Sequence, residues 1–152
     1  MYDALLGWLA SKRHVLIHQQ AGAIAAKSYK YTRMPANGAC QRLTRSLRQA
    51  AREFPKEEKY SLTDQIRRSS RAVNAMLGES WARRRYPAAF INKVNEALGE
   101  VMETQAWLDH ALDCEYISSD LYHELDESWQ HIGAMLNRMI QRAGDFCLPA
   151  SK

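Results

Sequence analysis

Residues 60–87 read YSLTDQIRRSSRAVNAMLGESWARRRYP, and their periodicity predicts the amphipathic helix around which the other segments are organised. Apolar or small side chains recur every three or four residues, which is the spacing of one helix face. That face comprises Leu62, Ile66, Ser69 or Ser70, Val73 and Leu77. The opposite side carries the basic side chains Arg67, Arg68 and Arg71. The stretch therefore predicts one helix with a buried face and a basic face.

Both ends of this helix are marked in the sequence. Ser61 precedes Asp64 by three residues, which predicts a capping box that satisfies free amides of the first turn. A run of three arginines at positions 83–85, followed by Tyr86, forms a basic corner at the other end. Pro87 ends the helix because the residue before a proline disfavours helical geometry, and proline itself suits the first position of the next helix.

Three further segments share the helical period. They span about residues 39–54, 87–114 and 118–144. We expect Ser118 or Ser119 to cap the last of them and Gly144 to end it. No segment shows the alternation with period two that a half-buried strand requires. Four helices with short connections predict an all-α fold, an antiparallel up-and-down four-helix bundle over residues 38–144.

The two ends of the chain are less regular. Residues 1–37 are assigned to an N-terminal extension of uncertain structure, in which helices over roughly 3–19 and 21–31 fit the apolar residues. Residues 34–38, MPANG, are typical of a turn that leads into the bundle. We expect residues 145–152 to be a frayed tail.

Length and composition indicate one globular domain. The chain has 152 residues, of which 46% are hydrophobic and 25% charged, the usual balance of a water-soluble protein. Its three cysteines are far apart and form no Cys-x-x-Cys pair, which favours reduced thiols over a disulfide framework. The most apolar N-terminal run, residues 4–10, is far shorter than the ~20 residues of a membrane span. We therefore expect a cytoplasmic protein with no membrane partner.

Charge is distributed unevenly along the chain. Residues 36–85 hold twelve Lys/Arg and five Asp/Glu and have a net charge of +7, whereas residues 86–152 hold four and eleven and have a net charge of −7. Such asymmetry predicts either a polyanion that binds the basic half or contacts between oppositely charged parts of neighbouring copies.

The arginines of two helices are candidate nucleic-acid-binding residues, because guanidinium groups match phosphate geometry. They are Arg42, Arg45, Arg48 and Arg52 on the first bundle helix, and Arg67, Arg68, Arg71, Arg83, Arg84 and Arg85 on the second. No base-reading motif accompanies them, and aromatic residues do not interleave with them, so sequence-specific readout is not expected. The alternative is a solvated face with local ion pairs, such as Asp64 with Arg67 or Arg68.

Residues 40–140 resemble the bacterial four-helix-bundle family of 23S ribosomal RNA intervening-sequence proteins. The resemblance rests on FPKEEKYSLTDQIRRSSR at 54–71, Glu79, RRY at 84–86, Ala89-Phe90, ETQ at 103–105, Trp107-Leu108 and Tyr116-Ile117. The family usually has Ser-x-x-x-Asn on the buried side of the central helix, where this chain has Ala72 and Met76. Any role of that polar pair is therefore in doubt here.

The resemblance implies a four-helix bundle that assembles into a ring-shaped homopentamer. It extends to the accessory protein of diversity-generating retroelements, a basic pentameric barrel that engages nucleic acid and a reverse transcriptase. No catalytic activity is established for the intervening-sequence branch. The resemblance thus implies a binding or assembly module whose partners are copies of itself, RNA or DNA, or a protein such as a reverse transcriptase.

Acidic and aromatic residues are candidates for contacts between such copies. Glu96, Glu100 and Glu103 are predicted to share a helix side away from the buried stripe, where they could meet the arginines of a neighbouring subunit. Trp81 and Tyr86 are the aromatic candidates for the same contact. The two hypotheses compete, because an arginine buried between subunits cannot hold a phosphate.

Catalytic and metal chemistry find little support in the sequence. There is no Glu-x-x-His pair of the di-iron bundles, no nucleophile elbow, no phosphate-binding glycine loop and no dinucleotide fingerprint. Asp120 and His123 have metal-ligand spacing, but no second copy of the pair exists. We expect no catalytic residues, no metal and no cofactor. The predicted function is a non-enzymatic oligomer that binds nucleic acid, and the alternative is a protein-binding scaffold.

Overall fold

The structure, a computed structural model, describes residues 35–148. The chain divides into a unit over residues 1–33, which lies outside the described residues, and a unit over residues 34–152. The predicted helices over 3–19 and 21–31 therefore also lie outside the description. The elements are α2 (Pro35–Ala50), the 3-10 helix η2 (Lys56–Tyr60), α3 (Leu62–Ala82), α4 (Pro87–Asp113), α5 (Ser119–Gln141) and α6 (Ala143–Phe146).

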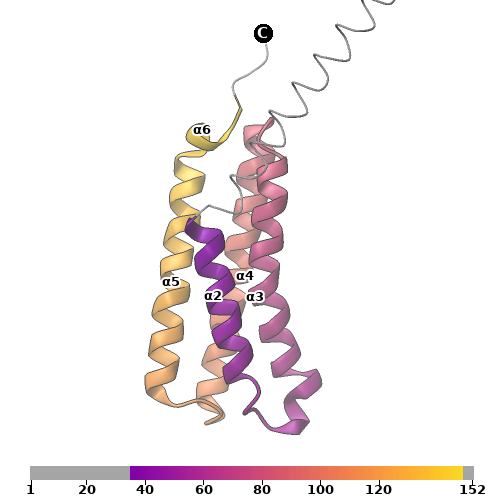
Figure 1. Ribbon diagram of the computed structural model, residues 1–152, viewed down its shortest axis with the longest axis vertical. Coiled ribbons are helices and arrows are strands. Elements are labelled where there is room, and N and C mark those ends of the chain that lie inside the picture. The colour runs from indigo at the N-terminus through magenta and orange to yellow at the C-terminus, as the bar shows by residue number, and fades with distance from the viewer. Residues whose placement is uncertain (1–34, 149–152) are drawn as a thin grey trace, which may run out of the picture. The chain divides into compact units, whose positions relative to one another are not determined.

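The four long helices of this region lie side by side along one axis, and each runs opposite to the next along the chain (Figure 1). Helix α3 packs against α4, α4 against α5, and α2 closes the bundle by contacting both α3 and α5. Residues 35–148 contain helices and turns and no strand. The predicted all-α, antiparallel four-helix bundle is confirmed.

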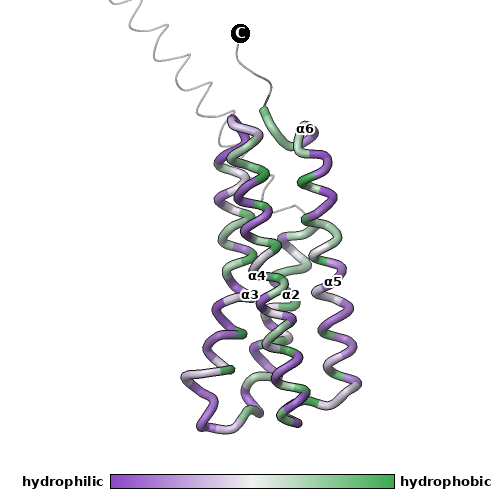
Figure 2. Tube along the Cα trace, turned by 180° about the vertical axis from the view of Figure 1, so that it is seen from behind, coloured by the Kyte–Doolittle hydropathy of each residue, from purple (hydrophilic) through white to green (hydrophobic). Residues whose placement is uncertain are grey.

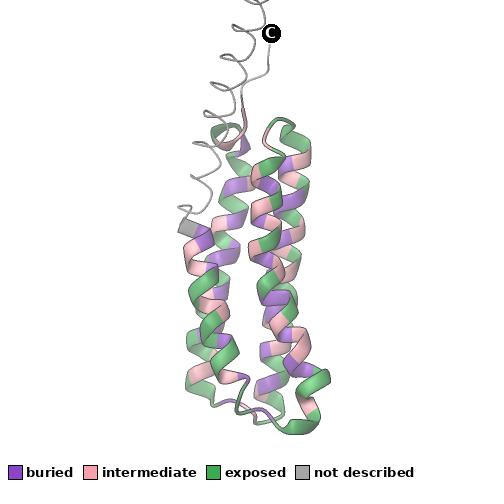
Figure 3. Cartoon of the chain, turned by 45° about the vertical axis from the view of Figure 1, so that its right-hand side comes forward, coloured by how far each residue is buried: buried purple, intermediate pink, exposed green. Residues whose placement is uncertain are grey.

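Hydrophobic residues recur along each helix (Figure 2), and buried residues alternate with exposed ones along each helix (Figure 3). The whole predicted stripe of α3, from Leu62 to Leu77, is buried. Helices α4 and α5 contribute Phe90, Leu108 and Trp129, each with 0% of its surface exposed. Removing this apolar surface from water is the main free-energy term that holds the helices together.

Helix α2 differs from its prediction at both ends. It begins at Pro35 instead of near residue 39, so the predicted turn over 34–38 is wrong at residues 35–38. Proline suits a first helical position because its missing amide would have no intrahelical partner there. The helix ends at Ala50 because the amides of Arg52 and Glu53 bond three residues back instead of four, and Pro55 then disfavours helical geometry at Phe54. Phe54 is nevertheless buried.

The start of α3 is capped by a residue that the sequence analysis did not select. The predicted Ser61–Asp64 capping box is wrong, because the Ser61 side chain makes no capping hydrogen bond. Instead, Glu58 Oε2 accepts hydrogen bonds from Ser61 Oγ and from the Leu62 amide, the latter over 3.2 Å. A carboxylate at a helix N-terminus is also favoured by the helix dipole.

The other predicted helix ends have mixed outcomes. Pro87 is the first residue of α4, as predicted. Ser118 caps α5 by accepting a hydrogen bond from the Leu121 amide over 3.3 Å, also as predicted. The prediction for Gly144 is wrong, since α5 ends at Gln141 and Gly144 lies within α6.

Residues 145–148 of the predicted tail lie at the end of the bundle where α3 meets α4. The ring of Phe146 stacks on Phe90 with centroids 6.0 Å apart, and the Leu148 amide donates to the carbonyl oxygen of Arg84 over 3.0 Å. Among the described residues, no helix combines the length and the apolar character that crossing a membrane requires.

Candidate nucleic-acid interface

The outward side of α2 and the turn after it carry a row of arginines, which we call the α2 arginine face: Arg42, Arg45, Arg48 and Arg52. All four side chains are exposed, whereas Cys40 and Leu47 on the opposite side of the helix are buried. No acidic residue occurs in α2, and none of the four arginines forms an ion pair with any residue of the described region. Their charge is therefore available to a partner.

The spacing of this face suits a polyanion. Three of its members fall within α2, and the six steps from Arg42 to Arg48 rise about 9 Å along the helix axis. Phosphates along one nucleic-acid strand recur about every 3.4 Å of helix axis, so this distance corresponds to roughly three phosphates. The face can bind a backbone without reading bases.

The three candidate arginines of α3 do not form one continuous surface. Arg67 is half-buried, and its Nε is buried without a hydrogen-bond partner in the described region. Arg68 and Arg71 are exposed and line a groove between α3 and α4 of about 440 Å³ that also contains Glu100 and Glu103. This groove has mixed charge and is therefore less suited to phosphate than the α2 arginine face.

The electrostatics of the groove act mainly on Glu100. Burial raises the pKa of Glu100, the neighbouring charge of Glu103 raises it further, and Arg68 opposes both effects. Arginine and glutamate of the same chain therefore interact across α3 and α4. Glu103 additionally accepts a hydrogen bond from Trp107 Nε1 over 3.1 Å.

Residues 83–86, which we call the arginine corner, hold their arginines in three different ways. Arg83 lies 3.6 Å from a carboxylate oxygen of Glu79. The guanidinium of Arg84 lies 3.6 Å above the ring centroid of Trp81, and its Nε donates to the Trp81 carbonyl oxygen over 2.7 Å. Burial lowers the pKa of Arg84. Arg85 is exposed and has no ion-pair partner in the described region.

Glu96, predicted as a subunit contact, is engaged within its own chain. Lys93 Nζ lies 2.5 Å from Glu96 Oε2 and 3.1 Å from Glu79 Oε2, so one lysine links the end of α3 to the start of α4. Hydrogen bonding to Glu96, and then to Glu79, raises the pKa of Lys93. The Asn92 side chain also donates to Glu96, over 2.9 Å.

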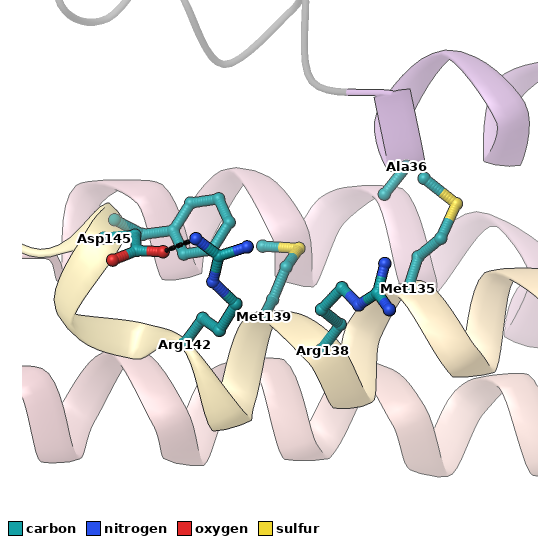
Figure 4. A pocket seen from close by; sticks show the side chains of 7 residues that line it. Ala36, Met135, Arg138, Met139, Arg142 and Asp145 are labelled. Atoms are coloured by element: carbon teal, nitrogen blue, oxygen red, sulfur yellow. Dashed lines mark ion pairs between the residues drawn. The ribbon is translucent and has the colours of Figure 1, made fainter.

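One pocket was not foreseen from the sequence. It lies at the end of the bundle where α6 folds back and has a volume of about 360 Å³. Its lining is Ala36, Met135, Arg138, Met139, Arg142, Asp145 and Phe146, seen together in Figure 4. Arg142 and Asp145 pair at 2.6 Å across one side. The spacing of Met139, Ala143 and Phe146, which continues the apolar period of α5, was the available signal for this pocket.

The described region offers little for metal or thiol chemistry. Among residues 35–148, no group of three or more His, Cys, Asp or Glu is arranged to hold a metal ion. Cys40, Cys114 and Cys147 are free thiols. Burial raises the pKa of Cys40 to about 12, which keeps that thiol protonated and unreactive near neutral pH.

Comparison with known proteins agrees with this geometry. Residues 38–138 match the family model described as 23S rRNA-intervening sequence protein. The chain belongs to this family. The 23S rRNA-intervening sequence fold therefore covers the bundle from α2 through most of α5.

A solved structure supports the assignment. The chain is similar to a protein of unknown function from the S23 ribosomal protein family of Bacteroides thetaiotaomicron, with 26% identity and a TM-score of 0.63. The similarity covers 70% of this chain and 98% of that one. No curated protein matches the sequence. Family membership thus identifies the fold and leaves the biochemical role to be argued from the surfaces.

Proposed function

We propose that this 23S rRNA-intervening sequence family member is a non-enzymatic, homo-oligomeric binding module that contacts the phosphate backbone of RNA or DNA through the α2 arginine face. The single observation that carries the proposal is that Arg42, Arg45 and Arg48 are exposed together on a helix without acidic residues, with Arg52 exposed in the turn that follows it. Elsewhere in the described region, Arg83 pairs with Glu79 and Arg84 folds onto Trp81.

The proposed binding is electrostatic and tolerant of sequence. Arginine side chains that replace condensed counterions give affinity that falls as salt concentration rises. Helix α2 carries no aromatic side chain on which a base could stack, so RNA and DNA of any sequence should compete. A ring of five subunits, as the family resemblance implies, would present several copies of the face and increase affinity by avidity.

A second candidate function is a protein-binding scaffold whose charged faces serve self-assembly or a protein partner such as a reverse transcriptase. The observation that favours it is the groove between α3 and α4, where two arginines lie beside two glutamates. Such a surface is complementary to a rotated copy of itself. Met102, with 52% of its surface exposed, lies on α4 and adds apolar area for a partner.

The two functions are separated by charge-removing variants that keep the arginine stem. We would compare the wild type with R42Q/R45Q/R48Q on α2 and with the matched control R68Q/R71Q on α3. Binding of a fluorescent single-stranded RNA of random sequence is measured between about 50 and 200 mM salt, together with the oligomeric mass by light scattering. Alanine variants of the arginine corner are less suitable, because Arg84 supports the local structure.

We expect the α2 variant to keep its mass and to lose about 2 units of the slope of log affinity against log salt, close to 0.7 for each of three lost phosphate contacts. The α3 control should retain most of the slope. Absence of binding by the wild type at low salt contradicts the nucleic-acid function. Loss of mass in the α2 variant would instead assign these arginines to subunit contacts and support the scaffold.

A further inference from the structure

Two aromatic side chains stand out from the described surface. Tyr86, in the arginine corner, has 64% of its surface exposed, and Tyr60, the last residue of η2, has 83%. The two rings differ in what covers them. Lys59 Nζ lies 5.0 Å from the ring centroid of Tyr60. In the region that the structure describes, the Tyr86 ring has neither an aromatic nor a cationic neighbour.

The backbone that carries Tyr86 is fixed by its surroundings. Its amide donates to the carbonyl oxygen of Arg83 over 2.9 Å, and its own carbonyl accepts from the Phe90 amide over 3.0 Å. Its backbone is extended, with φ −122° and ψ 99°, the conformation that a following proline favours. The ring therefore projects from a framework that exists before any ligand binds, which lowers the entropy lost on binding.

The corner is held closed by a second set of contacts. The Arg84 side chain is stacked on Trp81, and its carbonyl oxygen accepts the Leu148 amide over 3.0 Å. With Arg84 occupied in this way, the exposed arginines that remain in the arginine corner are Arg83 and Arg85. Arg83 is held only by a solvent-exposed pair with Glu79, an interaction of the kind that contributes little. The exposed ring of Tyr86 thus belongs to a short segment that also carries two exposed arginines.

We propose that Tyr86 is a stacking platform for an unpaired base and that Arg85 binds the phosphate next to it, so that single-stranded nucleic acid is the preferred ligand. This inference rests on the proposed function and narrows its ligand class. Every base has a π face, so stacking on tyrosine tolerates any sequence, and a base within a duplex is already stacked and cannot reach the ring. Tyr86 would then act in binding, whereas the sequence analysis assigned it to a subunit contact.

The test uses two probes with the same phosphates. One is a fluorescent single-stranded deoxyadenosine oligonucleotide, and the other is an oligonucleotide of equal length in which every base is absent. Their affinities are measured by anisotropy for the full chain, for Y86A, Y86F and R85Q, and for the matched control Y60A. Thermal unfolding and light scattering accompany each variant, since an exposed ring should be removable without loss of fold or assembly.

We expect Y86A to bind the deoxyadenosine probe about tenfold more weakly and the base-free probe as the wild type does, since stacking contributes a measurable part of the affinity for each base. Y86F and Y60A should bind both probes like the wild type. R85Q should bind both probes more weakly and reduce the salt slope by about 0.7, the value for one lost phosphate contact with a single strand.

Three results would overturn the inference. Equal binding of the deoxyadenosine probe by Y86A and the wild type would remove the platform, and so would equal affinity of the wild type for the two probes. Neither result would contradict the proposed binding of the phosphate backbone by the α2 arginine face. Loss of oligomeric mass in Y86A would instead support the prediction that Tyr86 lies in a contact between subunits. Failure of the wild type to bind either probe would instead reject the proposed function.

Discussion

The contact between α3 and α4 and the contact between α2 and α5 are built differently. Where α3 meets α4, side chains such as Val73, Leu77 and Val94 are 0% exposed, and Thr104 Oγ1 donates to Ser69 Oγ over 2.9 Å. Where α2 meets α5, two pockets of about 360 Å³ each are lined from both helices. A groove of about 440 Å³ also lies between α3 and α4, so the two contacts differ in the buried hydrogen bond and the ion pairs that join α3 to α4, and not in the presence of pockets.

Charged residues follow the same division. In the hairpin formed by α3 and α4, Lys93 pairs with Glu79 and Glu96, and the charge of Arg68 lowers the pKa of Glu100 against the effect of burial. On α2, the arginines have no ionic partner in the described region. The comparison teaches that charged residues of α3 and α4 pair with one another within the chain, whereas the arginines of α2 keep the exposed charge that the proposed function requires.

The largest effect should come from a cavity in the hairpin. Phe90 is 0% exposed and stacks on Phe146, so Phe90→Ala should lower the free energy of unfolding by about 3–5 kcal/mol in urea titrations. Leu43 of α2 is half-buried beside one of the pockets, so Leu43→Ala should cost only about 1–2 kcal/mol. Equal losses from the two substitutions would show that α2 is packed as firmly as the hairpin.

A smaller effect is expected from a matched pair of buried hydroxyls. Thr104 is fully buried and bonds Ser69 between α3 and α4, so Thr104→Val should cost about 1.5 kcal/mol. Thr44 of α2 is half-buried and donates to the carbonyl oxygen of Ser70 over 3.0 Å, so Thr44→Val should cost about 0.5 kcal/mol, because water can replace its bond. Urea unfolding of both variants checks the order, and the reverse order would contradict the comparison.

The smallest effect concerns pH at the end of the hairpin where Glu58 caps α3. Its hydrogen bond from Ser61, then those from the Leu62 amide and Tyr116, lower its pKa below the ordinary value of 4.5. A lowered carboxyl pKa contributes stability that is present above pH 4.5 and disappears as pH falls through the folded-state pKa.

Glu58→Gln should therefore unfold at a lower temperature than the wild type at neutral pH, and the difference should shrink below pH 4.5. Melting curves by circular dichroism across this range measure it. Glu57→Gln, at an exposed neighbouring position of η2, serves as the control and should melt like the wild type. A difference for Glu58→Gln that persists at low pH would mean that the side chain acts through packing and not through its charge.

The periodic apolar residues were sufficient to predict the bundle. The stripe from Leu62 to Leu77 and the start of α4 at Pro87 follow from spacing and from proline geometry, which are local properties of the chain. The residues that cap the helices were harder to predict. Ser61 has the expected motif, yet Glu58 reaches the same amide from η2, a short helix that periodicity does not reveal.

The surfaces were only partly predictable. The exposure of the α2 arginine face follows from its helix wheel, because the arginines lie opposite Leu47. The three arginines of the corner could not be distinguished by position in the sequence. Arg84 turns inward because Trp81 lies one turn earlier and Leu148 closes over its carbonyl, and the second contact joins residues far apart in the chain.

The stacking of Arg84 on Trp81 also gives the protein an optical reporter. A guanidinium charge held 3.6 Å above an indole ring perturbs the electronic transitions of that ring. Near-ultraviolet dichroism and tryptophan emission should therefore change when the corner opens, while the far-ultraviolet signal of the helices stays constant. Ligand binding near Tyr86 could be followed by the same signal without attaching a dye to the protein.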